Sequence, residues 1–200
     1  ANRMVTWEWD VLQDRIATSA SFADVYGLPA LAGAAEGFAL VVPEDRAAHL
    51  AHVQRIAEVG GDYRSEFRIV RPDTRQIVRL EERATAFRDA QGRVERVVGV
   101  TLDVTARKQA EVDTQFLTEL GERIRAGDDA GVLLADVARM TGAHLQVARC
   151  FFAEVDARAG RWSVRYDYRA PAELASIAGR YPFSTYPPEL VAALRAGQSI

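Results

Sequence analysis

Histidine and cysteine are the side chains of this sequence best suited to bind a metal or a cofactor, and they are few. The 200 residues contain three histidines and a single cysteine, Cys150. His49 shares a predicted helical stripe with Val53 and Ile56, so its imidazole would face an apolar interior, where it could ligate a haem iron. The alternative is a partly buried histidine satisfied by a backbone carbonyl or water. Because the histidines and the cysteine are scattered, no metal-ligand set is predicted.

Other chemistry is not predicted either. Cys150 lies beside two phenylalanines of a predicted strand, where a thiol acts as a small hydrophobic side chain. The glycine-rich segment 27–37 follows no strand and lacks Lys-Ser or Lys-Thr, so it is not a phosphate loop. Carboxylates alternate with arginines on predicted strands, which is typical of solvated cross-strand pairs. We therefore expect no catalytic residue in this sequence.

Composition narrows the class of protein. Hydrophobic residues make up 48% and charged residues 26%, which is ordinary for a globular chain. A net charge of -3 gives no reason to expect a nucleic-acid partner, and no apolar run is long enough for a membrane segment. One cysteine fits a reducing cytoplasm. The chain begins with alanine and ends on Gly-Gln-Ser-Ile, so we expect a fragment of a longer protein.

The periodicity of the first hundred residues predicts the elements that would position these side chains. Strands are expected at 5–10, 16–17, 62–71, 77–89 and 93–104. A short helix is expected near 22–26, and a longer one begins near Pro43 and ends at Gly60. This order predicts an α+β unit whose antiparallel sheet has one face covered by helices.

Five short stretches in this region resemble successive landmarks of PAS sensor domains. They are WEWD, VVPEDR, YRSEFRIVRPD, FRDAQGRVERVVGV and LDVTARKQAE, and they cover roughly residues 4–111. Asp103-Val104-Thr105 resembles the family's Asp-Ile-Thr motif, where the last strand passes into an output helix. The resemblance implies a PAS domain over 1–104, with a five-stranded antiparallel sheet and flanking helices. Thr74 departs from the family, which usually has glycine there.

A long linker helix is expected after the sheet, over 105–127. Asp103 or Thr105 would cap it by accepting a backbone N–H, and these residues with Arg107 are the predicted signal-relay residues. A heptad-like apolar stripe would pair two such helices in a homodimer. The stripe consists of Ala110, Leu117, Leu120 and Ile124, with Asp113 breaking one position. The alternative is a helix that packs on its own domain, which needs a similar stripe.

The PAS resemblance also implies a pocket for a ligand. The candidate lining residues are Trp9, Phe22, Tyr26, His49, Val53, Phe67, Ile69 and Val98. The same residues would equally form an ordinary core. Oxygen-sensing PAS kinases carry a haem-binding histidine on the corresponding helix, which implies haem on His49 as one option. Residues 1–149 contain no cysteine, so cysteine-based flavin photochemistry is not expected.

Residues 128–200 resemble the N-terminal part of a GAF domain, a helix followed by the hairpin RCFFAEVD and WSVRYDYR. The order PAS then GAF resembles phytochromes. Their GAF domains carry Ser-Asp-Ile-Pro near a bilin, whereas this chain has Ser184-Thr185-Tyr186-Pro187 and no cysteine near its N-terminus. Bilin binding is therefore not expected.

Taken together, the resemblances imply a cytoplasmic PAS-GAF input region of a bacterial sensor histidine kinase. Its signal would pass mechanically through paired linker helices to a kinase domain beyond residue 200. Two alternatives stay open at this point. One is a ligand-free dimerisation scaffold, and the other is the input region of another effector, such as a cyclic-nucleotide enzyme.

Overall fold

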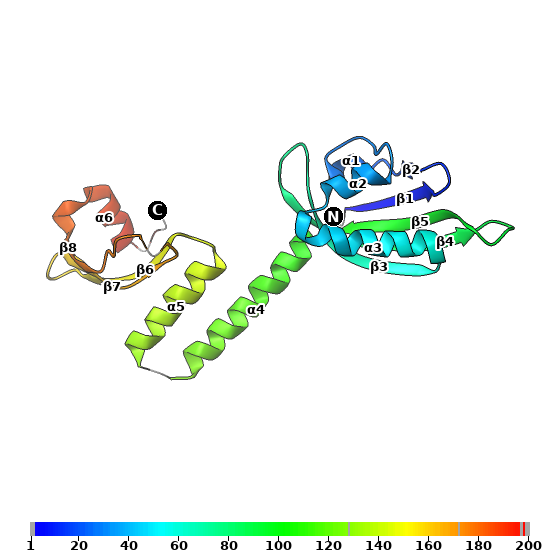
Figure 1. The fold of residues 1–200 in the computed structure, drawn as a ribbon. Helices are drawn as coiled ribbons and strands as arrows, with labels where there is room; N and C mark the ends of the chain where they lie inside the picture. Colours follow the sequence, from blue (N-terminus) through cyan, green and yellow to red (C-terminus); the bar gives the residue numbers. More distant parts are fainter. Residues whose placement is uncertain (1–2, 128, 172, 197, 199–200) are drawn as a thin grey trace. The chain divides into compact units, whose positions relative to one another are not determined.

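The chain folds into two compact units, Ala1–Val112 and Asp113–Ile200, each with its own antiparallel sheet (Figure 1). The computed structural model describes residues 3–127, 129–171, 173–196 and 198. The expected α+β class is confirmed, with a five-stranded antiparallel sheet, flanking helices and a second, smaller sheet.

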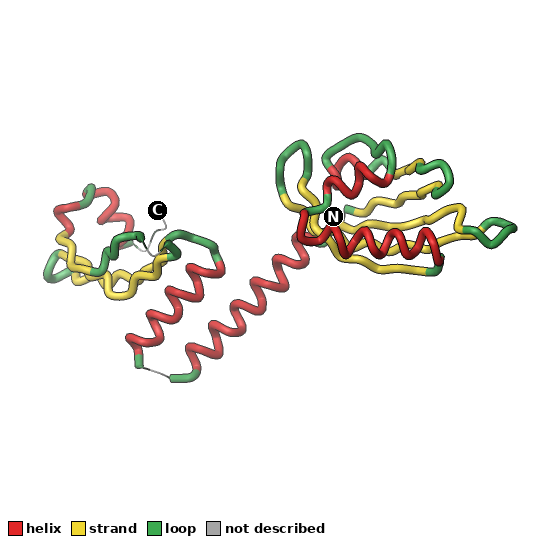
Figure 2. Tube along the Cα trace, in the orientation of Figure 1, coloured by secondary structure: helices red, strands yellow, loops and turns green. Residues whose placement is uncertain are grey.

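The first unit is a sheet whose inner face is covered by three helices. Its elements are β1 (Met4–Asp10), β2 (Arg15–Thr18), α1 (Phe22–Tyr26), α2 (Ala34–Leu40), α3 (Pro43–Val59), β3 (Asp62–Val70), β4 (Ile77–Arg88) and β5 (Val94–Asp103). The strand order is β2-β1-β5-β4-β3, so the last strand lies at the centre, between β1 and β4. Figure 2 shows the loop between β4 and β5 projecting past the end of the strands.

Strand periodicity sets which side chains enter the core. On β3 and β4 the inward residues include Phe67, Ile69 and Leu80, which pack against α1 in the main core cluster. An ion pair fixes α3 on this sheet, because the Asp45 carboxylate accepts bonds from the Arg68 guanidinium at 2.8 Å and from the Arg68 backbone N–H at 2.9 Å. The covered face predicted from the sequence is therefore present.

The inward face of β5 corrects one prediction. Val97, Gly99 and Thr101 are buried against the core, whereas Val98 faces the opposite side of the sheet and lies outside the pocket. Gly99 is paired with Trp7 of β1, whose ring lies over it, so that a Cβ at Gly99 would be 2.3 Å from the ring. The sequence prediction chose Val98 for its apolar side chain, but the register of β5 places Gly99 and Thr101 on the core side with Val97.

The second unit is a helix packed on a three-stranded sheet. Its elements are α5 (Ala130–His144), β6 (Arg149–Asp156), β7 (Arg161–Arg169), β8 (Gly179–Pro182), the short 3-10 helix η1 (Phe183–Thr185) and α6 (Pro188–Arg195). Asp129 caps α5 by accepting N–H bonds from Gly131 and Val132. Gly142 lets α5 approach β7 closely, because a Cβ there would be 2.1 Å from the Tyr168 ring.

Helix α4 (Thr105–Arg125) continues from β5 and carries no buried residue. Within the second unit, the Arg123 guanidinium binds the Asp136 carboxylate at 2.6 Å, which ties the end of α4 to α5. The α4 side chain of Asp113 lies 3.0 Å from the His144 imidazole of α5. Among the described residues, no helix has the length and apolar character needed to cross a membrane.

Gly99→Ala tests the close packing of Trp7 on β5. We expect it to lower the free energy of unfolding of the first unit by about 1–3 kcal/mol, because the new methyl group must displace the indole ring. Gly37→Ala on α2 is the matched control, since its nearest neighbour is 3.5 Å away and alanine favours a helix. Urea unfolding followed by tryptophan fluorescence measures both, and an unchanged Gly99→Ala stability would contradict the packing.

Candidate functional site

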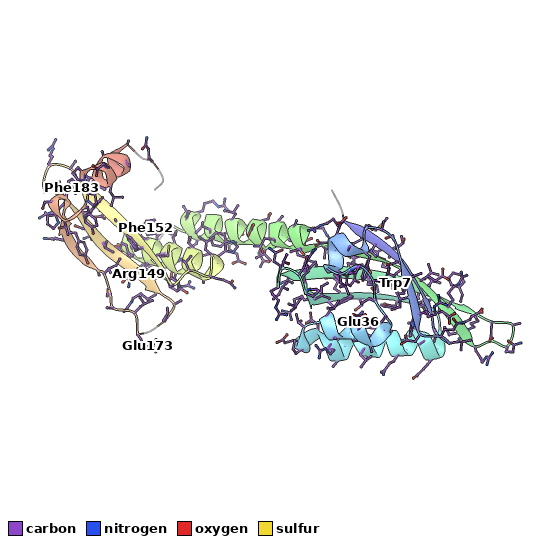
Figure 3. The ribbon with its side chains drawn as sticks, turned by 90° about the horizontal axis from the view of Figure 1, so that it is seen from above. Trp7, Glu36, Arg149, Phe152, Glu173 and Phe183 are labelled. Carbon is purple, nitrogen blue, oxygen red and sulfur yellow. The ribbon has the colours of Figure 1, made fainter. Side chains whose placement is uncertain are left out.

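The first unit has a cavity of about 80 Å³, partly open to solvent, between the inner face of the sheet and helices α1 to α3. Six of the eight predicted pocket residues line it: Trp9, Phe22, Tyr26, His49, Val53 and Phe67. Ile69 is fully buried in the adjacent core and does not reach the cavity, and Val98 lies on the other face. Trp7, labelled in Figure 3, also lines the cavity, as do Phe38, Tyr63 and Glu82.

Glu82 is the one carboxylate in the cavity wall, and its side chain is buried. The Tyr63 hydroxyl donates to one of its oxygens, and the Thr101 hydroxyl donates to the other at 2.8 Å. The Trp7 indole N–H in turn donates to the Thr101 hydroxyl oxygen at 2.9 Å. Burial raises the pKa of Glu82, and these hydrogen bonds offset only part of that effect.

Sequence reasoning missed Glu82, because it treated the glutamates of β4 as solvated cross-strand partners. That prediction was wrong for this residue. The signal that could have found it is register: Glu82 follows Val78 and Leu80 at intervals of two, so it must face the core with them.

His49 lies in the cavity wall as a buried side chain with only 7% of its surface exposed. Its ring stacks on Phe67 at a centroid distance of 3.8 Å, and its Nδ1 lies 3.3 Å from the Ser65 hydroxyl. Burial, with a smaller contribution from His52, lowers the pKa of His49 to about 4, so the imidazole is neutral at pH 7. Haem on His49 stays a prediction.

The predicted relay residues lie where β5 passes into α4. The Asp103 carboxylate accepts the Thr105 backbone N–H at 3.0 Å and binds the Arg3 guanidinium at 3.1 Å. Thr105 does not cap the helix with its hydroxyl, which instead accepts the Arg79 backbone N–H of β4 at 2.9 Å. The Val104 N–H bonds the Arg79 carbonyl at 2.9 Å, so the start of α4 is attached to the backbone of β4.

Arg107, the third relay residue, joins an ion cluster on the outer face of the sheet. Its guanidinium lies 2.9 Å from the Glu81 carboxylate, which also binds Arg83 at 2.8 Å and Arg64 at 3.1 Å. Glu81 is nearly inaccessible to solvent, yet its pKa is lowered, chiefly by the hydrogen bond from Arg83. One carboxylate of β4 thus holds three arginines, one of them on α4.

The predicted pairing stripe of α4 is largely exposed. Leu117 and Ile124 expose 63% and 52% of their surfaces, Ala110 is exposed, and Leu120 is half-buried. The Asp113 position in the stripe is occupied within the chain, because the His144 ring of α5 contacts it. Helix pairing itself stays a prediction.

In the second unit, the segment compared with the bilin motif takes part in aromatic packing. The Tyr186 ring meets Trp162 edge-on at 4.8 Å, and Phe183 meets the same indole at 5.2 Å. Cys150 is half-buried on β6. Within the described ranges, no group of three or more histidine, cysteine or acidic side chains could hold a metal.

The two consecutive glutamates of β4 are expected to show opposite pH signatures. Burial favours the neutral form of Glu82, so its contribution to stability is full below its ordinary pKa of about 4.5 and is lost as the pH rises through its elevated pKa. Glu82→Gln should therefore gain stability relative to wild type at pH 7–8, and the gain should vanish below pH 4.

Glu81→Gln is the matched control with the opposite sign. The pKa of Glu81 is lowered, so its stabilisation is present above its ordinary pKa and is lost in acid. This variant should lose stability at neutral pH and approach wild type below pH 4. Urea unfolding from pH 3 to 8 measures both variants, and parallel pH profiles would refute the assignment of the two faces.

Comparisons with known proteins agree with this fold. The family model described as PAS fold matches residues 15–101. A sensory box histidine kinase/response regulator from Burkholderia thailandensis E264 has 24% identity, a TM-score of 0.50, and coverage of 60% of this chain and 92% of that chain. The N-terminal domain of a diguanylate cyclase with a PAS/PAC sensor from Marinobacter aquaeolei has 18% identity, a TM-score of 0.49, and coverage of 52% and 98%. No curated protein matches the chain.

The family match and the Burkholderia structure agree with the architecture described above. The matched residues 15–101 run from β2 to β5, and together with β1 these strands form the antiparallel sheet with helices on one face. The first unit therefore has the PAS fold, which the family model matches over residues 15–101.

Proposed function

We propose that this chain is the sensory input region of a bacterial sensor histidine kinase. One observation carries the proposal: Glu81 and Glu82 are consecutive on β4 and face opposite sides of the sheet. Glu82 lines the cavity, and Glu81 binds Arg107 on the output helix. A change in the cavity that shifts β4 would therefore also shift Glu81 and, through its ion pair with Arg107, the first turn of α4.

The relay is mechanical. Occupation of the cavity would change the hydrogen bonds of Glu82 to Tyr63 and Thr101, and with them the preferred position of β4. The start of α4 would follow, because Val104 and Thr105 are both bonded to the backbone of Arg79 on the same strand. Two positions of this junction would correspond to two states of the output helix.

The kinase assignment rests on the resemblance of the sequence to PAS-GAF input regions. The helix and hairpin of α5, β6 and β7 have the order with which a GAF domain begins. We place no catalytic residue in this chain and assign catalysis to a kinase domain in the same protein, in the cytoplasm. The cavity and the buried carboxylate of Glu82 in its wall favour a sensor. A ligand-free scaffold would need neither a cavity nor a buried carboxylate.

We also propose that α4 pairs with the α4 of a second copy. The residues Ala110, Leu117 and Ile124 recur every seven positions and stay exposed, although Asp113 within the stripe and Phe116 beside it contact His144 of α5. A second helix would bury this stripe in the way a two-stranded coil does.

Leu117→Glu tests the pairing. We expect it to convert a dimer into a monomer in light scattering at micromolar concentration, because a carboxylate at the centre of the stripe would be buried without a partner. Val112→Glu is the matched control: it is similarly exposed, at 51%, but lies on the other side of α4, and it should remain dimeric. A monomeric wild type, or loss of the dimer in both variants, would reject the pairing.

Arg107→Ala tests the relay. In the protein with its output domain, the variant should change the ratio of kinase activity between signal states about five-fold or more, a typical coupling between sites. Arg125→Ala, at the opposite end of α4 and exposed, should leave the ratio unchanged. Autophosphorylation measures both variants, and equal behaviour of the two would count against the Glu81–Arg107 connection.

A further inference from the structure

We propose that the cavity of the PAS unit binds a small alkylammonium ion, with the ammonium N–H groups donating to Glu82 and the alkyl groups held between aromatic rings. This inference rests on the proposed function, since it names the class of signal that the sensor detects. It depends on three properties of the cavity: its aromatic lining, its single carboxylate and its size.

Aromatic rings form most of the lining. Seven of the fifteen lining residues are Trp, Tyr or Phe, contributed by the sheet, α1 and α2. Trp7 and Trp9 come from β1, and Tyr63 and Phe67 come from β3. The faces of such rings attract a cation within about 6 Å of the ring centre, more strongly where water is excluded. A neutral apolar ligand would need no such excess of rings over aliphatic side chains.

Glu82 supplies the negative charge. No lysine or arginine lines the cavity, and within the described part of the chain the carboxylate of Glu82 binds the hydroxyls of Tyr63 and Thr101. A buried carboxylate without a cation is costly, so in the free protein it is held by the hydroxyls of Tyr63 and Thr101. A bound ammonium group would provide the missing counter-charge and stabilise the ionised carboxylate.

The same lining excludes other ligand classes. An amino acid or another zwitterion would bring a carboxylate, and the wall holds no cation to pair with it, because His49 is neutral at pH 7. Anionic ligands would meet Glu82 itself. A single water needs about 10–15 Å³, so a cavity of about 80 Å³ has room for roughly five to eight non-hydrogen atoms. A simple primary amine of four or five such atoms meets all three conditions.

Isopropylammonium chloride and isopropanol provide a matched pair of probes with the same carbon skeleton. Each is titrated at pH 7 into the ¹⁵N-labelled chain at constant ionic strength, and the indole N–H signals report binding. We expect the signals of Trp7 and Trp9 to shift and that of Trp162, in the second unit, to stay fixed. The cation should bind about ten-fold more tightly than the alcohol, the factor that about 1.4 kcal/mol supplies.

Two variants make the result decisive. Glu82→Gln keeps the shape of the side chain and removes its charge, so the preference for the cation should fall to near one. Glu81→Gln removes the neighbouring carboxylate on the other face, so it should keep the preference. Equal affinity of wild type for both probes, absence of binding, or an undiminished preference in Glu82→Gln would each overturn the cation site.

The outcome separates this site from the relay. In the wild-type protein, binding of the cation without a change in kinase output would reject the relay alone. Glu81→Gln should bind the cation normally without that change in output, because it loses the connection to α4. A kinase output that responds to Arg107→Ala, in a chain that binds no amine, would reject the cation site alone.

Discussion

The burial of one carboxylate constrains much of the PAS unit. Glu82 cannot lie on the inner face of β4 unless polar groups surround it, since an unsatisfied buried acid destabilises the fold by several kcal/mol (of the order of 2–7). Tyr63 and Thr101 provide those groups, and Trp7 orients the Thr101 hydroxyl. The Trp7 ring needs space on β5, which only a glycine at position 99 leaves. Four residues from three strands are thus coupled to one side chain.

A β-strand necessarily places consecutive residues on opposite faces, and β4 uses this property with two acids. Glu82 sits in an apolar wall that raises its pKa, while Glu81 is surrounded by arginines that lower its pKa. The two carboxylates belong to adjacent residues, but the surroundings of Glu82 favour its neutral form and those of Glu81 favour its ionised form. Two adjacent residues of β4 therefore link the cavity to α4: Glu82 lines the cavity and Glu81 binds Arg107 of α4. No chain of packed side chains is needed between them.

The strands, α1 and α3 of the first unit could be predicted from the sequence, because their periodicities are regular and their ends carry proline, glycine or turn residues. Helix α2 was missed, because it is short and buries no residue. The pocket was predicted in part, since a list of large apolar residues does not distinguish a core from a cavity. Val98 and Glu82 were misassigned for the same reason: the sequence shows polarity, whereas the face of each residue depends on register across the sheet. The ion cluster of Glu81 was also beyond reach, because Arg64, Arg83 and Arg107 converge only in three dimensions.

Thermodynamic linkage limits what any ligand of this cavity can do. If occupation of the cavity favours one state of α4, then whatever fixes α4 in that state must raise the affinity of the cavity by the same factor. Pairing of α4 with a second helix would be one such influence, acting through Arg107 and the Arg79 backbone on β4. A ligand that fills a cavity of only about 80 Å³ binds with little free energy. Its binding can therefore reverse the preference between the two states of α4 only if their free energies in the free protein differ by less than that amount. The two states of the junction between β5 and α4 must then have similar free energies in the free protein. The hydrogen bonds of Asp103 and Thr105 at this junction contribute free energies of that small size.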